Sequence, residues 1–557
     1  MKWPVPVTAI RPRVLQLDRH DNVLIALVDL QAGDEVEWNG ATLRLVSDVP
    51  AKHKFATDDL GPGSEVTMYG VLVGKTTMRV RCGEVITTQN LHHSAAEFHV
   101  QEKPFEWHAP DVSRWQQRTF QGYRRADGQA GTRNYWLVVP LVFCENRNVQ
   151  TMKDALENAL GFAKPGVYRD YVVELRDLYR AGKMDEIQRL RLASGESRPG
   201  RSSLFENVDG IKFLLHEQGC GGTREDARNL CGLLAGYLHH PNTAGATVLS
   251  LGCQHAQVKI LREEIAKRDP YFSKPLVILE QQQSGTETEL MTRALRETFL
   301  GVAEANNCRR EAVPLSELCV GLKCGGSDGF SGISANPAIG ATSDLLCGLG
   351  GRTILSEFPE LCGVEQDLIN RSARPEVGER FAKLMRDYAT RAATVGAGFD
   401  MNPSPGNIRD GLITDAMKSA GAEKKGGSSP VTAVLDYPEY SAVPGLNLLC
   451  TPGNDVEAVT GQVGAGASVV LFTTGLGTPT GNPIVPVVKL STNSQLAQRM
   501  PDIIDVNTGD IVTGEKGVPE MGEEILEFVI RVASGERVKA ELLSQDDFIP
   551  WKRGVSL

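Results

Sequence analysis

The chain has 557 residues, too many for one ordinary hydrophobic core, and this length predicts roughly two to four domains. Its 41% hydrophobic and 23% charged fractions are typical of a soluble globular protein. A net charge of −10 argues against a nucleic acid or an anionic membrane as the partner. No apolar run approaches the roughly 20 residues that span a bilayer.

Cysteine usage and the first residues bear on the compartment. The eleven cysteines form an odd number in a long chain, which favours a reducing compartment over a disulfide framework. The opening run MKWPVPVTAIRPR lacks the apolar core of a signal peptide. We therefore expect a cytoplasmic protein that acts on a small molecule.

Residues 1–100 have the pattern of short strands joined by turns. The run NVLIALVDLQAGDEVEWNG contains a β-rich stretch and then alternation that ends at Asn39-Gly40, a strong turn dipeptide. This pattern predicts a small all-β domain. Residues 101–125 are polar, aromatic and poorly periodic, and they predict a linker that packs on a surface.

From residue 126 short apolar runs alternate with helical stretches. NYWLVVPLVFC is a continuous apolar run of strand length, as expected for a strand buried on both faces. GATVLSLGCQ, GRTILSEFP and ASVVLFTTG are similar, and helical stretches such as ETELMTRALRETFLGVAEAN lie between such runs. This alternation predicts the α/β class with largely parallel sheets. We expect two such domains, at residues 126–310 and 311–557.

Four cysteines stand in polar or glycine-rich turns that follow apolar runs: Cys144, Cys220, Cys253 and Cys324. In open α/β sheets, ligands bind at the carboxyl ends of the strands, so cysteines at these positions are candidate metal ligands. Their spacing is too wide for a zinc ribbon or a ferredoxin motif. Buried thiols in tight turns are the alternative.

Two histidines and two glycine-rich runs are further candidates. His216 precedes Cys220 by four residues and suits either a metal site, a base or a satisfied core histidine, whereas His53 stands among lysines, as surface histidines often do. TTGLGTPTGNPIVP contains neither a Walker loop nor GxGxxG, and its hydroxyls and backbone donors suit a polyol or a carboxylate. TPGNDVEAVTG predicts a helix start near Asp455, which would attract anions.

Several runs together resemble the altronate/galactarate dehydratase family. They are GYRRADGQAGTRNYWLVVPLVFC, HEQGCGGTRED, HPNTAGATVLSLGC, CGGSDGFSGISANP, PSPGN, PGLNLLCTPGND and LFTTGLGTP with NPIVPVVKLSTNS. The N-terminal runs DNVLIALVDLQAGDEV and AKHKFATDDLGPG resemble the SAF (β-clip) domain of these enzymes. The likeness extends over nearly the whole chain, and its layout is closer to altronate than to galactarate dehydratases.

The resemblance implies a hydro-lyase that removes water from a sugar acid. For D-altronate the product would be 2-dehydro-3-deoxy-D-gluconate, in hexuronate (galacturonate) catabolism. Members of this family are iron(II)-dependent, and an iron–sulfur cluster or another divalent metal is the alternative cofactor. Alternative functions are a galactarate dehydratase, a sulfolactate sulfo-lyase-like enzyme and a non-catalytic sugar-acid-binding protein. We also expect a homo-oligomer, the usual state of soluble enzymes of this size.

Matching the motifs position by position gives the candidate site residues that the resemblance implies. The metal ligands would be Cys144, Cys220, Cys253 and Cys324, and the catalytic residues His53, His216 and Asp328. The substrate contacts would be Arg133, Asn134, Ser327, Asn454, Asp455, Thr478, Lys489 and Asn493. One departure is notable, because Thr87 and Gln89 stand where the family often has histidines, with His92 and His93 nearby.

Overall fold

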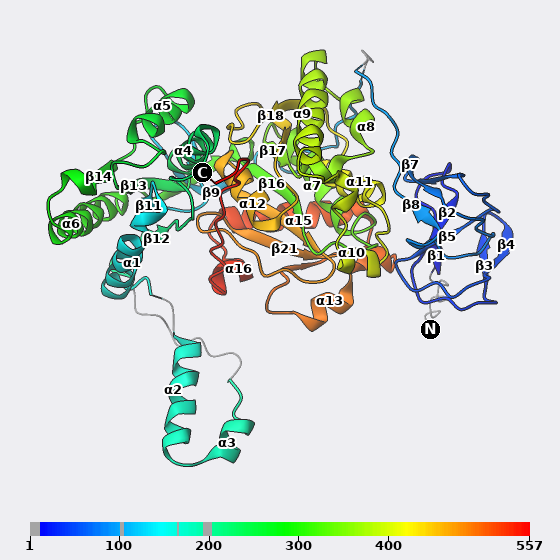
Figure 1. Cartoon of the computed structure of the whole chain (residues 1–557), viewed down its shortest axis with the longest axis horizontal. Coiled ribbons are helices and arrows are strands. Elements are labelled where there is room, and N and C mark those ends of the chain that lie inside the picture. The colour runs from blue at the N-terminus through cyan, green and yellow to red at the C-terminus, as the bar shows by residue number, and fades with distance from the viewer. Residues whose placement is uncertain (1–11, 101–104, 164–165, 193–202, 557) are drawn as a thin grey trace, which may run out of the picture.

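The structure is a computed structural model that describes residues 12–100, 105–163, 166–192 and 203–556. Its three parts follow one another along the chain, with the N-terminal β region at one end, a middle region at the other and a large C-terminal region between them (Figure 1). None of the helices among the described residues combines the length and the apolar character that crossing a membrane requires.

Short antiparallel strands form the N-terminal β region, as the turn-rich pattern predicts. The strand order is β1-β2-β5 in one sheet, β3-β4 in a second and β6-β7-β8 in a third. The strands are β1 (Val14–Leu15), β2 (Val23–Ala26), β3 (Glu35–Trp38), β4 (Ala41–Arg44), β5 (Lys54–Ala56), β6 (Glu65–Met68), β7 (Val71–Thr76) and β8 (Leu91–His92). Its core is shared with the C-terminal region, since Phe330, Ile333 and Met417 pack into it.

A parallel sheet of order β12-β11-β13-β14 forms the middle region. The strands are β11 (Tyr135–Pro140), β12 (Gly210–Phe213), β13 (Thr243–Ser250) and β14 (Leu276–Glu280). The helices are α1 (Asn146–Leu160), α2 (Val167–Arg180), α3 (Met184–Arg189), α4 (Arg224–His239), α5 (Val258–Arg268) and α6 (Glu287–Ala305). Every residue of β11 is buried, which explains its continuous apolar sequence. The helices α2 and α3 project away from this region (Figure 1).

A small antiparallel sheet of β9 (Thr119–Arg124), β10 (Ala130–Gly131) and β15 (Arg310–Pro314) joins the middle and C-terminal regions. The strand β9 lies inside the segment predicted as a linker. The reason is long-range pairing with β15, which buries Phe120 completely and which no local periodicity in this segment indicates. Residues 101–104 of the predicted linker lie outside the described residues.

The C-terminal region is built on a seven-stranded sheet of order β18-β19-β17-β16-β20-β21-β22, parallel throughout. The strands are β16 (Cys319–Cys324), β17 (Arg352–Leu355), β18 (Val431–Leu435), β19 (Gly445–Leu449), β20 (Val469–Thr474), β21 (Val487–Ser491) and β22 (Val506–Asn507). The predicted α/β class with parallel sheets and a small N-terminal β domain is confirmed.

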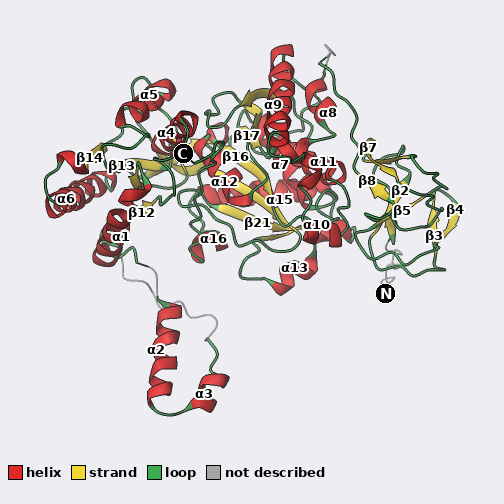
Figure 2. Cartoon of the chain, viewed as in Figure 1, coloured by secondary structure: helices red, strands yellow, loops and turns green. Residues whose placement is uncertain are grey.

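Helices surround this sheet (Figure 2). They are α7 (Ala335–Gly348), α8 (Glu365–Asn370), α9 (Pro375–Ala393), α10 (Pro405–Arg409), α11 (Asp415–Glu423), α12 (Asp455–Gly464), α13 (Ser494–Arg499), α14 (Gly509–Val512), α15 (Val518–Ala533) and α16 (Lys539–Leu542). The 3₁₀ turns η4 (Phe358–Leu361) and η6 (Lys424–Gly426) matter for the site below. The helix α12 packs on β16 and against α4 of the middle region.

Candidate active site

A cavity of about 460 Å³ opens where strands of the C-terminal sheet end. Because the sheet is parallel, β16, β17 and β20 end at the same edge, where α/β proteins bind their ligands. Its lining includes Cys324, Ser327, Glu360, Asn402, Lys418 and Asp455. Cys324 ends β16, and Glu360 belongs to η4 just after β17. Glu357, at the start of that turn, has a left-handed backbone (φ 70°), a strained state that is common at functional sites.

The floor of this cavity is a network of three lysines and three acids, all buried except Asp455. Lys425 Nζ lies 2.7 Å from Glu357 Oε2 and 3.0 Å from Cys324 Sγ. Lys418 Nζ lies 2.8 Å from Glu360 Oε1. Lys323 pairs with Glu357 and lies 2.9 Å from Asp455 Oδ1. The formal charges of the six groups cancel, as burial of charge requires.

Burial and these neighbours set the protonation states of the cavity floor. Burial raises the pKa of the Cys324 thiol to about 12, and the nearby Glu360 carboxylate adds to the shift. Burial also opposes ionisation of Glu360, yet Lys418, Lys425 and Lys323 lower its pKa to about 2. The floor therefore presents a neutral Cys324 thiol, charged lysine ammonium groups and an ionised Glu360 carboxylate at neutral pH.

Cys324, Glu357 and Glu360 are a candidate metal-binding group. One donor atom of each lies within 4.8 Å of the other two, and thiolate with carboxylate oxygens is a donor set that iron accepts. Lys425 occupies part of this space, because its ammonium contacts both Cys324 and Glu357. The residues fit an ion by type and spacing, and the ion would take the place of the Lys425 contacts.

The other three predicted ligands lie at the corresponding edge of the middle sheet. Cys144, Cys220 and Cys253 are exposed thiols that follow β11, β12 and β13. Cys220 lines a separate cavity of about 270 Å³ together with His255. The structure thus gathers three of the four cysteines at one sheet edge and places Cys324 on another sheet. Among the described residues, these three thiols do not form a group whose donor atoms all lie within 4.8 Å of one another.

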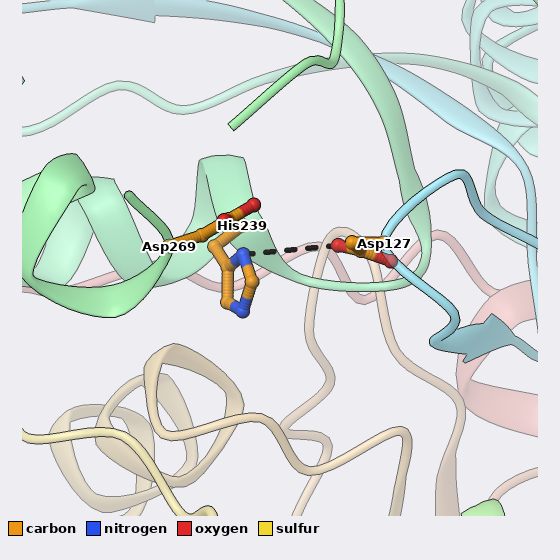
Figure 3. A group of neighbouring side chains, drawn as sticks. All are labelled: Asp127, His239 and Asp269. Atoms are coloured by element: carbon orange, nitrogen blue, oxygen red, sulfur yellow. Dashed lines mark ion pairs between the residues drawn. The ribbon is translucent and has the colours of Figure 1, made fainter. Parts of the chain in front are cut away.

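Asp127, His239 and Asp269 form a second group with metal-ligand spacing, and His239 Nδ1 lies 3.9 Å from Asp127 Oδ2 (Figure 3). Lys274 donates to the carbonyls of His239 and His240, and the pKa of His239 falls to about 4 through burial and the charges of Lys274 and Arg268. None of the predicted metal ligands belongs to this group, so we assign no metal to it.

The surroundings of His216, predicted as a catalytic residue, are those of a structural histidine. Its Nε2 lies 2.7 Å from the Pro140 carbonyl, and its Nδ1 accepts a hydrogen bond from Gln218 N at 3.1 Å. Burial lowers its pKa to about 4. Both ring nitrogens of a neutral imidazole are thus engaged with main chain, which supports the alternative of a satisfied core histidine.

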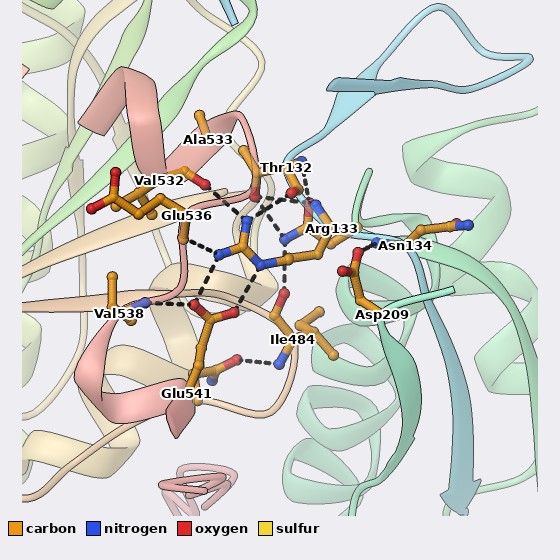
Figure 4. Close-up of polar contacts among 12 residues, drawn as sticks. Thr132, Arg133, Asn134, Asp209, Ile484, Val532, Ala533, Glu536, Val538 and Glu541 are labelled. Atoms are coloured by element: carbon orange, nitrogen blue, oxygen red, sulfur yellow. Dashed lines mark hydrogen bonds and ion pairs between the residues drawn. The ribbon is translucent and has the colours of Figure 1, made fainter. Parts of the chain in front are cut away.

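Of the predicted substrate contacts, Arg133 connects the middle and C-terminal regions, whereas Asn134 bonds within the middle region (Figure 4). Arg133 Nε and Nη2 pair with Glu541 at 2.7 and 2.8 Å, and its guanidinium also donates to the Val532 and Glu536 carbonyls. Asn134 Nδ2 donates to Asn207 O at 2.7 Å. Arg133 is 1% exposed, so it has no surface left for a substrate.

Three of the remaining predicted substrate contacts line the cavity, and the other three do not. Ser327, Asn454 and Asp455 line the cavity, and Asn454 caps α12. Thr478 lies beside the wall, since a Cβ on Gly326 would come within 3.0 Å of its Oγ1. Lys489 instead points to Thr480 O and Gln545, and burial lowers its pKa to about 8. Asn493 caps α13 and donates to Asp328 Oδ2 at 3.3 Å.

The predicted proton-transfer candidate His53 lies at the seam between the N-terminal β region and the C-terminal region. It is half-buried, its Nδ1 lies 3.3 Å from Ala51 O, and burial lowers its pKa. Asp328, the other catalytic candidate, is fully buried beneath the cavity wall. Thr87 caps the turn that holds Gln89, which is exposed, so neither replaces a histidine in the cavity.

Sequence reasoning missed Lys418, Lys425, Glu357 and Glu360, which carry most of the cavity's charge. Their sequence context offers little signal, because lysine and glutamate are normally exposed and DAMKSAGAEKKGG has the composition of a surface helix. Only pairing among β16, the η4 turn, α11 and η6 explains their burial.

Three family models match consecutive parts of the chain: the altronate/galactarate dehydratase SAF domain (12–94), the D-galactarate dehydratase/altronate hydrolase second domain (122–306) and the D-galactarate/altronate dehydratase C-terminal domain (315–556). Altronate dehydratase of Bacillus subtilis (strain 168) is 34% identical, over 98% of this chain and 99% of that protein. Altronate dehydratase of Escherichia coli (strain K12) is 33% identical over 96% and 98%. Galactarate dehydratase (L-threo-forming) of the same strain is 31% identical over 93% and 92%. The predicted resemblance is confirmed, and the chain belongs to the D-galactarate/altronate dehydratase family.

Proposed function

We propose that this protein is a hydro-lyase that converts D-altronate to 2-dehydro-3-deoxy-D-gluconate and water. The observation that carries the proposal is the match to altronate dehydratases along nearly the whole chain, at 33–34% identity. Galactarate is the second candidate substrate, because a galactarate dehydratase matches at 31% identity.

The cavity of the C-terminal sheet suits a polyhydroxy acid. Its volume of about 460 Å³ lies in the range typical of small-molecule sites, roughly 300–1,000 Å³. Ser327, Asn402 and Asn454 offer hydroxyl and amide groups for the hydroxyls of a sugar acid. Lys418 offers an ammonium group for the carboxylate.

Elimination of water requires a base for the C2 proton and an acid for the departing C3 oxygen. Two carboxylates line the cavity, Glu360 and Asp455. Lysines hold the pKa of Glu360 near 2, which makes it a weak base. We therefore assign the C2 proton to Asp455, whose side chain is 28% exposed and lies 2.9 Å from Lys323. Lys418 would stabilise the negative charge that develops on the substrate carboxylate.

Iron(II) is the cofactor that we propose, held by Cys324, Glu357 and Glu360. A bound divalent ion would supply Lewis-acid polarisation of the substrate oxygens. The alternative is an iron–sulfur cluster on Cys144, Cys220 and Cys253, since thiolates are the ligands of such clusters. A third version of the proposal places another divalent metal at Cys324, Glu357 and Glu360. Metal content after anaerobic reconstitution, with electron paramagnetic resonance, distinguishes these sites in Cys324→Ser and Cys220→Ser variants.

The compartment and assembly belong to the same proposal. The eleven cysteines are free thiols, which is usual in a reducing cytoplasm. We propose that the enzyme acts there in galacturonate degradation, as a homo-oligomer and without nucleic-acid partners.

The test is turnover by anaerobically purified protein with and without iron(II), on D-altronate, galactarate and sulfolactate, with assays for the 2-keto-3-deoxy acid and for sulfite. Turnover of altronate above the other two supports the proposal. Asp455→Asn should lose at least a hundredfold in kcat, whereas Asp502→Asn, which removes an exposed carboxylate, should not. Preference for galactarate or sulfolactate would reassign the substrate, and iron-loaded protein inactive on all three would contradict the enzyme assignment.

A further inference from the structure

The turn before β5 in the SAF domain has a strained residue that faces the C-terminal region. Lys52 is a non-glycine residue with φ of 74°, in the left-handed region. Such a backbone is unfavourable for a non-glycine residue and persists where the surroundings enforce it, often at functional sites. The neighbouring Lys54 helps to enforce it, because its buried ammonium donates to Lys52 O at 2.9 Å and to Gly411 O at 2.6 Å.

The C-terminal region provides a fitted seat for this turn. A Cβ on Gly329 or on Gly411 would lie 2.4 Å from Lys52 O, closer than any side chain allows. Two glycines thus let the main chain of the turn approach two segments of the C-terminal region. Gly329 N also donates to Asp410 O at 2.8 Å, so these two segments touch each other at the same place.

The Lys52 side chain then connects the two segments. Its Nζ lies 3.0 Å from Asp328 Oδ2 and 2.9 Å from Asp410 Oδ1. Asp328 is completely buried and also accepts from Asn493 Nδ2 at 3.3 Å. Burial opposes the charge of Lys52, but the two carboxylates outweigh it and raise the pKa of the ammonium.

Both carboxylates directly follow parts of the cavity wall. Asp328 comes after residues 324–327, which line the cavity without a break. Asp410 directly follows α10. The cap residue of this helix, Ser404, and Asn407 within it line the cavity. Asn407 Nδ2 donates to Ser327 O at 2.8 Å, which joins the two wall segments on the cavity side.

We propose that Lys52 is a positioning residue of the active site: it clamps the two wall segments through Asp328 and Asp410, so that the SAF domain completes the cavity. The proposal deepens the proposed dehydratase function and rests on it. Lys52 would act through the wall, because it does not line the cavity. Small displacements of such walls matter, since a misplacement of about 1 Å can cost roughly a hundredfold in rate.

The test compares Lys52→Met, Lys52→Arg and Lys75→Met in the full-length, reconstituted protein. Methionine keeps the length of the side chain and the same backbone requirement but removes the charge. Lys75 is the matched control, because it pairs with Glu65 at 3.3 Å within the SAF domain and is 39% exposed. Asp410→Asn, at a partly exposed carboxylate, breaks half of the clamp and serves if Lys52→Met does not fold.

Two readouts separate this proposal from the proposed function. We expect kcat to fall roughly 10- to 100-fold in Lys52→Met with a smaller change in KM, to recover at least tenfold in Lys52→Arg, and to stay within twofold of wild type in Lys75→Met. We also expect faster hydrogen exchange in residues 324–331 and 404–411 of Lys52→Met alone. Unchanged exchange in both segments, or kcat within twofold of wild type, would overturn the clamp. If Lys52→Met exchanges faster than wild type in these segments but wild type is inactive on every sugar acid, the clamp stands and the dehydratase function is overturned.

Discussion

Replacement of Lys418 by methionine tests the charge network beneath the cavity. Lys418 Nζ lies 2.8 Å from Glu360 Oε1, and the two side chains are only 9% and 3% exposed. Removal of one partner from a buried ion pair costs about 3–5 kcal/mol. Lys425 and Lys323 also stabilise the ionised Glu360, so we expect the low end, about 3 kcal/mol.

Urea unfolding followed by tryptophan fluorescence measures this loss of stability. With a slope of about 3 kcal/mol per molar urea, the midpoint should fall by about 1 M. Loss of the ammonium group should also lower kcat/KM for D-altronate by roughly 30-fold or more, equivalent to about 2 kcal/mol. Lys424→Met is the matched control, because Lys424 pairs with Glu423 but is 41% exposed, and its change should stay within about 0.5 kcal/mol. A Lys418→Met protein with an unchanged midpoint and kcat/KM within threefold of wild type would refute the reasoning.

Three further predictions concern other sites. Cys324→Ala should abolish iron binding at the C-terminal group while the fold persists, and full occupancy measured by metal analysis would remove Cys324 from the ligand set. His216 has a folded pKa near 4 against an ordinary value of 6.5, so its contribution is complete above pH 6.5 and is lost as the pH falls towards 4. His216→Gln should therefore reduce the loss of stability between pH 7.5 and pH 5 by about 2 kcal/mol, and urea midpoints at the two pH values check this. Arg133→Met should cost about 3–5 kcal/mol in unfolding free energy because it removes the partner of Glu541 from a largely buried ion pair, with KM for the sugar acid unchanged; a raised KM would return Arg133 to the substrate site.

The fold class could be predicted because strands of parallel sheets are buried on both faces. The apolar runs at β11, β16 and β20 follow from this, and every residue of the three strands is buried. The same reasoning correctly placed cysteines at strand ends. It could not assign each strand end to its sheet, since Cys253 follows β13 and Cys324 ends β16, and these strands belong to two different sheets.

The polar partners could not be predicted, because they are supplied by residues far apart in sequence. His216 is satisfied by Pro140 O, which lies 76 positions away. Arg133 meets Glu541, 408 positions away. A single sequence shows that such residues carry charge or a ring nitrogen, but the neighbour that decides between structural and catalytic roles is visible only once the chain is folded.

The balanced charges of the six-group network beneath the cavity, to which Lys323, Glu357 and Lys425 belong, also constrain how this protein can vary in evolution. Lys323 and Lys425 share Glu357, and all three side chains are at most 1% exposed. Any single replacement leaves an uncompensated charge in the interior, whereas a paired replacement preserves neutrality. These positions are therefore expected to change together among descendants of one ancestor, and intermediates that carry only one of the changes should be selected against.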